Sequence, residues 1–253
     1  YLAGSGTSTS QLAFGGSDPG GPGVTKTESW DGSSWTEVND LATSRMMLGG
    51  DGASNTSAIA FGGSGDGYSP DKNETEEWSF SGVQPGDEAS YSDAIIGDFY
   101  YNSSTGQFKN IGTGVGTWAS GGNVNSARTH GGGAGNSNSA NLFFGGQSPP
   151  SNTTRAYTET YDGTSWTEVG DLNQAQHYIS GTGSSTAAIV AGGNRASTPG
   201  GDTSVNAETW DGSSWTEVAN LNVGRNGVAL FGTSTSAIGA SGYSPATSPN
   251  YSL

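Results

Sequence analysis

Short apolar stretches that end in a pair of small residues, usually two glycines, recur along the chain. Four clear copies and one degenerate copy occur, at 12–16, 59–63, 142–146, 189–193 and 238–242. Each apolar run is bounded by glycine and spans about three residues, which is typical of a short buried strand. The copies follow one another at steps of 47, 83, 47 and 49 residues. The pattern therefore predicts repeats of about 50 residues, with about 36 extra residues in one of them.

A polar segment with two aromatic positions follows three of these apolar stretches. Thr27–Val38 reads Thr-Glu-Ser-Trp-Asp-Gly-Ser-Ser-Trp-Thr-Glu-Val, and near-identical copies occupy Thr158–Val169 and Ala207–Val218. Asp-Gly is a strong signal for a two-residue hairpin, so each copy predicts two antiparallel strands. A Gly-rich strand is expected before each apolar strand. In four repeats this strand follows a residue at one fixed repeat position, and these register residues are Arg45, Arg128, Gln176 and Arg225. Four short strands in about 50 residues indicate one blade of a β-propeller.

The repeat register places the blade boundaries. We expect one all-β domain over 1–253, a propeller of about five four-stranded blades. The boundaries lie at about 1–42, 43–124, 125–172, 173–221 and 222–253, and the last blade is incomplete. The extra residues form an insertion at 79–117 in blade 2, where alternating apolar and polar residues at 97–109 predict a β-hairpin. Two arrangements remain open: five blades that close with one short blade, or a piece of a longer ring.

The composition is unusual for a folded domain. Leu, Ile, Val and Phe number 35 of 253 residues and the net charge is −15, values that on composition alone indicate disorder. The chain nevertheless has seven Trp and 44 Gly. Glycine suits inner strands that crowd around a propeller axis, and Trp and Tyr suit the wider spaces between blades. The repeat pattern of these residues therefore indicates a folded domain more strongly than the overall composition indicates disorder.

Charge and residue types exclude several function classes. No apolar run approaches the roughly 18 residues of a membrane helix, and 8 Lys and Arg against 23 Asp and Glu argue against nucleic-acid binding. The chain has no Cys, and its two imidazoles, His130 and His177, have no cluster of further ligands in the sequence. No nucleophile, base and orienting residue form a set. We therefore expect no cofactor, no metal and no enzymatic activity.

The acidic residues that recur in register are expected to belong to the scaffold. An active site needs one constellation, whereas these residues repeat from blade to blade. We expect the third-strand glutamates to pair with the register arginines or to face solvent, and they are Glu28, Glu76, Glu159 and Glu208. The hairpin aspartates are expected to stabilise their turns, and they are Asp31, Asp162 and Asp211.

An arginine, an apolar strand ending in Gly-Gly, and an aromatic and a Trp at fixed offsets resemble the kelch repeat of β-propellers. The motifs Trp-Asp-Gly-Ser-Ser-Trp-Thr-Glu-Val and Ala-Phe-Gly-Gly are similar to repeats in kelch-like virion proteins of marine bacteriophages. The stretch Tyr101–Phe108 also resembles a short hairpin of phage structural and fibre proteins. The resemblance does not imply catalysis of the galactose-oxidase type, because the cofactor of galactose oxidase requires a Cys and this chain has none.

The resemblance implies a non-enzymatic structural or adhesion module of a phage virion, located on the particle or outside the cell. Its expected partners are other virion proteins and host-surface glycans or proteins, in a homo-oligomeric or larger assembly. Variable loops on a rigid scaffold commonly carry binding residues. The candidate binding residues, mostly on the loops and the insertion, are Asp66, Tyr68, Tyr100, Tyr101, Asn102, Tyr157, Asp202 and Tyr243. Two alternatives are a secreted propeller that processes glycans and a purely structural filament or virion subunit, in which 79–117 contacts a neighbouring chain.

Overall fold

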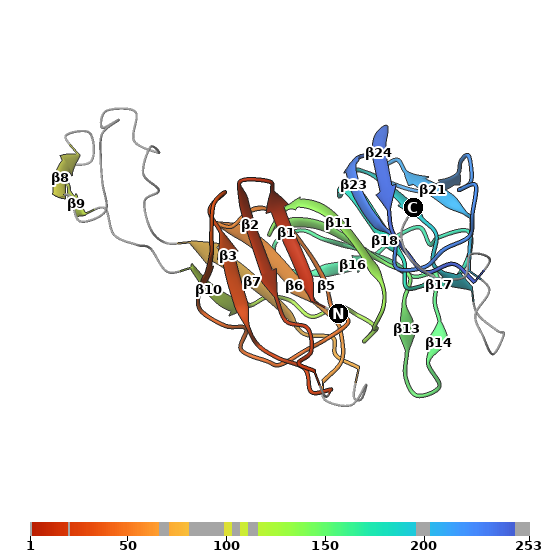
Figure 1. Cartoon of the computed structure of the whole chain (residues 1–253), viewed down its shortest axis with the longest axis horizontal. Helices are drawn as coiled ribbons and strands as arrows, with labels where there is room; N and C mark the ends of the chain where they lie inside the picture. Colours follow the sequence, from red (N-terminus) through yellow and green to blue (C-terminus); the bar gives the residue numbers. More distant parts are fainter. Residues whose placement is uncertain are drawn as a thin grey trace.

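The computed structural model describes residues 2–19, 21–65, 71–80, 99–102, 107–110, 116–195 and 203–245. Every regular element in this part of the chain is a β-strand (Figure 1). No helix in it is suited to spanning a membrane. The expected all-β propeller arrangement is confirmed.

Four antiparallel four-stranded sheets form the blades. Blade 1 contains β1 (Ala3–Thr7), β2 (Ser10–Phe14), β3 (Thr27–Trp30) and β4 (Trp35–Glu37). Blade 2 contains β5 (Gly49–Ser54), β6 (Ser57–Phe61), β7 (Thr75–Phe80) and β10 (Gly116–Ser120). Blade 3 contains β11 (Gly132–Ser137), β12 (Ala140–Phe144), β15 (Thr158–Tyr161) and β16 (Trp166–Glu168). Blade 4 contains β18 (Ser180–Ser184), β19 (Ala187–Ala191), β21 (Ala207–Trp210) and β22 (Trp215–Glu217).

Four two-stranded sheets complete the described elements. They pair β8 (Phe99–Asn102) with β9 (Gln107–Asn110), β13 (Gln147–Ser148) with β14 (Thr153–Thr154), β17 (Gln176–His177) with β20 (Asn194–Arg195), and β23 (Ala229–Thr233) with β24 (Ser236–Ala240). The β23–β24 hairpin follows blade 4 in the chain, and β23 lies beside β18.

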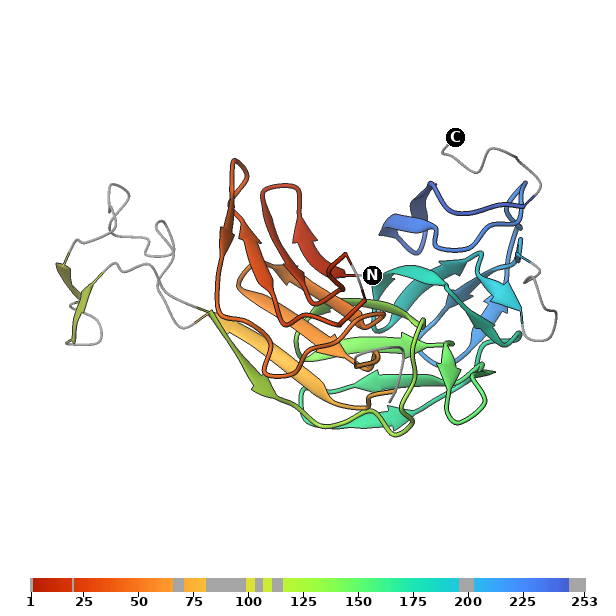
Figure 2. The same cartoon turned by 60° about the horizontal axis from the view of Figure 1, so that its bottom comes forward.

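The first strands of successive repeats lie side by side in the order β1, β5, β11, β18, β23. Figure 2 shows the result as an open arc, with blade 1 on one side and the β23–β24 hairpin on the other. Glycine makes this crowding possible at the inner strands. A Cβ built on Gly50 would lie 2.6 Å from the Phe14 ring, and one built on Gly133 would lie 3.0 Å from the Phe61 ring.

The apolar core lies between the blades. In blades 1, 2 and 3, an aliphatic residue and the last Phe of the second strand pack toward the following blade. The following blade contributes an aromatic pair and the alternate residues of its own second strand, which include Ala58, Phe143 and Val190. At the boundary of blades 3 and 4, for example, Leu142 and Phe144 pack with Trp210 and Trp215. The third- and fourth-strand aromatic pairs of blades 2, 3 and 4 therefore fill the interblade spaces, as expected from their register.

Three boundaries share what we call the interblade contact set. The fourth-strand Trp of one blade packs edge-on against the last Phe of the preceding blade's second strand. The pairs are Phe14–Trp118, Phe61–Trp166 and Phe144–Trp215, with ring centroids 4.9, 5.0 and 5.0 Å apart. The same indole Nε1–H donates to the hydroxyl of the first residue of the preceding blade's third strand. These bonds are Trp118 to Thr27 at 3.1 Å, Trp166 to Thr75 at 2.9 Å and Trp215 to Thr158 at 2.9 Å.

Recurring charged residues stabilise the scaffold, as expected. Arg45 Nη2 lies 2.5 Å from Glu76 Oε1, and Arg128 Nη2 lies 2.6 Å from Glu159 Oε1, with all four side chains buried. In the first hairpin, Asp31 accepts hydrogen bonds from the backbone N–H groups of Ser33 and Ser34, both at 2.8 Å. The Ser33 hydroxyl and these N–H groups lower the pKa of Asp31 to about 2. Asp162 and Asp211 make the same backbone contacts in their turns.

Candidate functional site

One end of the blades, which we call the loop face, carries the connections from second to third strands. The β13–β14 hairpin protrudes from it (Figure 1). The other end, the turn face, carries the short hairpin turns, including those of the Asp-Gly pairs. The turns repeat closely, whereas the loops differ in length and sequence. The loop face is therefore the part of the surface on which the repeats diverge.

Backbone hydrogen bonds link neighbouring blades at the loop-face end of the inner strands. The linked residues are Met47, His130, Tyr178 and Gly227, which occupy one repeat position and have φ values of 55, 57, 53 and 61°. Each N–H donates to the preceding carbonyl in this row, at 3.3, 2.8 and 2.9 Å. Left-handed backbone at non-glycine residues is uncommon, and its recurrence here indicates a conserved geometry of the scaffold rather than an isolated irregularity.

Three rings gather on this row. The His130 and Tyr178 ring centroids are 4.0 Å apart, and His177 lies 5.0 Å from Tyr178. Burial, with the nearby His177, lowers the pKa of His130 to about 4, and burial also lowers the pKa of His177. Each Nδ1 contacts a threonine hydroxyl at 3.1 Å, Thr129 for His130 and Thr154 for His177. At neutral pH the cluster is therefore uncharged, with His130 and Tyr178 half-buried and His177 buried.

Two of the candidate binding residues, Tyr243 and Tyr157, lie on or near this face. Tyr243 is 45% exposed and pairs through its backbone with Asn226, one residue before the row. Tyr157 is half-buried, with the Arg155 and Arg128 guanidinium carbons 5.3 and 6.0 Å from its ring.

The other candidates are separate from these two tyrosines. Tyr100, Tyr101 and Asn102 belong to β8, whereas Asp66, Tyr68 and Asp202 lie outside the described residues. Sequence reasoning missed Tyr178, although its register with Met47 and His130 is visible in the repeats.

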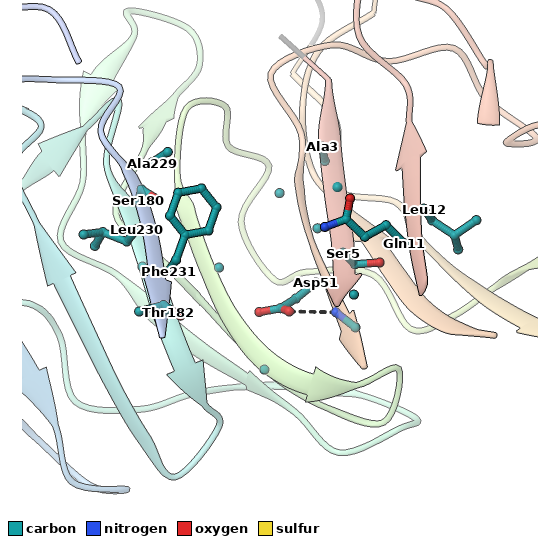
Figure 3. Close-up of a pocket in the computed structure, with 18 of the residues that line it drawn as sticks. Ala3, Ser5, Gln11, Leu12, Asp51, Ser180, Thr182, Ala229, Leu230 and Phe231 are labelled. Atoms are coloured by element: carbon teal, nitrogen blue, oxygen red, sulfur yellow. Dashed lines mark hydrogen bonds between the residues drawn. The ribbon is translucent and has the colours of Figure 1, made fainter. Parts of the chain in front are cut away.

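A cleft of about 1330 Å³ lies along the inner strands and opens between blade 1 and β23. Figure 3 shows Phe231 on one side of it and Ser5, Gln11 and Asp51 on the other. Small residues of the inner strands form much of its lining, together with Trp35 and Glu28. Burial raises the pKa of Asp51 to about 7, although the N–H groups of Gly52 and Gly135 donate to this carboxylate.

Grouped ionisable side chains are few in the described part of the chain. The described residues contain no group of three or more His, Cys, Asp or Glu side chains suited to a metal ion. Glu28 and Asp51 are the two acidic residues among those that line the cleft. The Asp51 carboxylate already accepts two backbone hydrogen bonds, and the one from Gly135 ties blade 2 to blade 3. The lowered pKa values keep both loop-face imidazoles neutral at physiological pH.

The fold places the chain among β-propeller proteins, a class that supports many unrelated functions. The sequence matches no protein-family model, and it matches none of the curated proteins.

Proposed function

We propose that the chain is a kelch-like propeller that serves as a non-enzymatic structural and adhesion module of a phage virion. It would belong to a tail fibre or surface appendage and bind a host-surface glycan or protein through the loop face. The resemblance of its repeats to phage virion proteins supports the location. The β23–β24 hairpin is interpreted as the first half of a fifth blade, because it continues the register of the first two strands.

One observation carries the adhesion proposal: aromatic rings lie where the irregular loops meet. His130, His177 and Tyr178 form a neutral cluster there, and exposed Tyr243 belongs to the same face. Sugar rings stack on aromatic faces, and their hydroxyls exchange hydrogen bonds with imidazole, phenol and amide groups. The paired residues Arg45, Glu76, Arg128 and Glu159 are buried in the scaffold and are not available for this role.

Binding to a glycan array and to host cells tests the proposal. Tyr178→Gly removes a ring and keeps a residue that tolerates the left-handed backbone, as Gly227 does at the equivalent position. Tyr243→Ala removes the exposed ring. We expect each variant to weaken binding about tenfold, which corresponds to about 1.4 kcal/mol of stacking.

The matched control is Thr186→Ala, an exposed residue in the hairpin turn on the opposite face. It should bind as well as the wild type. Absence of binding by folded, assembled protein would contradict adhesion, and an equal loss in Thr186→Ala would contradict the assignment to the loop face.

A further inference from the structure

Blade 1 has a face with the chemistry of an interblade boundary but with no described blade against it. Its aromatic pair, Trp30 and Trp35, has ring centroids 5.4 Å apart at 40°. The equivalent pair in blade 4, Trp210 and Trp215, is also 5.4 Å apart, at 45°. Trp35 is 46% exposed, whereas Trp215 is 5% exposed. The aromatic half of the interblade contact set is therefore formed in blade 1 and remains uncovered.

The inner edge of this face has room for a phenylalanine ring. Gly4 occupies the repeat position of Gly50, Gly133 and Gly181, and a ring from the preceding blade lies over each of those three glycines. A Cβ built on Gly4 would meet only the carbonyl oxygen of Leu12, at 3.3 Å. The site that holds Phe14, Phe61 or Phe144 at the other boundaries is thus present at Gly4.

The outer edge of the face carries a glutamate whose equivalents in blades 2 and 3 accept a hydrogen bond from the preceding blade's connection. Glu76 and Glu159 each accept a backbone N–H from the connection that leaves the preceding blade, from Ala42 and Asn125, both at 2.7 Å. Glu28 occupies the same position in blade 1 and is exposed. Its carboxylate is therefore placed to receive an incoming connection.

We propose that this face, defined by Gly4, Ala13, Glu28, Trp30 and Trp35, is a docking surface for a further blade of the same repeat type. The partner must present an aromatic ring at the end of its second strand, for Gly4 and the edge of Trp35. It must also present a threonine hydroxyl at the start of its third strand, for the indole N–H. Its outgoing connection supplies a backbone N–H to Glu28.

The observations disfavour a second copy of this chain as the partner. The hairpin that a second copy has available is β23–β24, with Phe231 and Ile238 61% and 72% exposed. Ala240 occupies the position of the required phenylalanine in that hairpin, so it leaves the edge of Trp35 uncovered. A sugar that stacks on Trp30 and Trp35 is the other alternative. The proposal is independent of the loop face and of adhesion.

The test appends a blade to the full chain. A copy of residues 125–177, which contains Phe144 and Thr158, is fused directly before Tyr1, in the register in which it precedes Tyr178. Hydroxyl-radical footprinting with mass spectrometry then measures the oxidation rate of Trp35. We expect the rate to fall several-fold, toward that of Trp215, and amide exchange in β3 and β4 to slow.

The matched control is the same fusion with Phe144→Ala and Thr158→Ala in the appended copy only. It should leave Trp35 substantially more reactive, and equal protection would overturn the proposed contacts. A second fusion, of residues 173–226 with Ala191→Phe and Ala207→Thr, ends one residue before the position equivalent to Tyr1 and guards against a poorly folding first copy. If neither fusion slows oxidation of Trp35, the proposal is wrong.

Two measurements on the unmodified chain test the competing occupants. Sedimentation velocity combined with footprinting overturns the proposal if self-association protects Trp35. A glycan array overturns it if an oligosaccharide binds the wild type and Trp35→Ala abolishes that binding. Glycan binding that depends on Tyr178 and not on Trp35 supports the loop-face function. Such a result does not contradict docking of a further blade on the blade 1 face. The two proposals can therefore fail separately.

Discussion

Blades 3 and 4 have the same strand order and the same register between their second and third strands, but they stabilise the start of their inner strands differently. In blade 3, buried Arg128 pairs with Glu159 and also donates to the carbonyls of Gly145 and Tyr157, at 3.0 and 2.8 Å. In blade 4 the equivalent residues are Gln176 and Glu208, both buried. Among the described residues, neither Gln176 Oε1 nor Glu208 Oε1 has a hydrogen-bond partner. The blade geometry thus survives without the ion pair, because the strand ladders and Asn173, which donates twice to Glu208 Oε2, are kept.

A second difference concerns the fit between blades. Phe144 at the end of the second strand of blade 3 faces Gly181 of blade 4. One repeat later, Ala191 occupies the phenylalanine position and Leu230 the glycine position. The first pair places a large Phe144 opposite Gly181, whereas the second pair places a small Ala191 opposite the larger Leu230. The comparison suggests that the boundary conserves the combined volume of the pair rather than the identity of either residue.

The largest expected effect comes from removing the blade 3 arginine. Arg128→Ala leaves Glu159 as a buried charge without its cation, so we expect a loss of about 3–5 kcal/mol in the free energy of unfolding. Urea unfolding followed by circular dichroism measures this loss. The control is Gln176→Ala in blade 4, where no ion pair is lost and about 1–2 kcal/mol is expected. Equal losses in the two variants would show that the ion pair does not distinguish the blades.

The volume exchange predicts a rescue. Gly181→Leu places side-chain atoms against the Phe144 ring and should destabilise the protein by about 1–3 kcal/mol. Adding Phe144→Ala reproduces the pair Ala191 and Leu230 and should recover part of that loss. Phe144→Ala alone should cost about 3–5 kcal/mol through the cavity it creates. Additive losses in the double variant would refute the complementarity, and a double-mutant cycle in urea decides between the two outcomes.

The strands were predictable from the sequence because glycine pairs, Asp-Gly turns and Trp positions repeat with one register. The exposure of each Trp was not predictable. Trp35 and Trp215 have the same local sequence, Ser-Ser-Trp-Thr-Glu-Val, but among the described residues a preceding blade packs against Trp215 and none packs against Trp35. The ring cluster on the loop face was missed for a similar reason. His130 and Tyr178 are distant in sequence and meet only because β11 and β18 lie side by side.

An intermediate effect is expected at an inner-strand position that also differs between blades, Asp51 in blade 2 and Thr182 in blade 4. Burial raises the pKa of Asp51 to about 7, well above its value in an unfolded chain. Between pH 4 and 7 the folded state therefore binds more protons than the unfolded state, and this group makes stability fall as pH rises. The slope is at most about 1.4 kcal/mol per pH unit and disappears above pH 7.

Urea unfolding at several pH values from 4.5 to 8 compares wild type with Asp51→Asn. The variant should lose this part of the pH dependence and should gain stability relative to the wild type as pH increases. Asp18→Asn, at an exposed position, serves as the control and should follow the wild-type curve. Parallel curves for wild type and Asp51→Asn would show that Asp51 titrates at its ordinary pKa.

The smallest effect is expected from giving blade 4 the ion pair of blades 2 and 3. In Gln176→Arg, the guanidinium should reach Glu208 and the carbonyls of Gly192 and Asn206, which occupy the positions of Gly145 and Tyr157. The buried carboxylate gains a charge-assisted partner, but desolvation of the arginine offsets most of the gain. We therefore expect a stabilisation of about 1 kcal/mol in urea unfolding. Gln176→Met, of similar size but without donors, should not stabilise the protein. If Gln176→Met stabilises as much as Gln176→Arg, the benefit comes from packing, and the unpaired Glu208 oxygen is not what distinguishes blade 4 from blade 3.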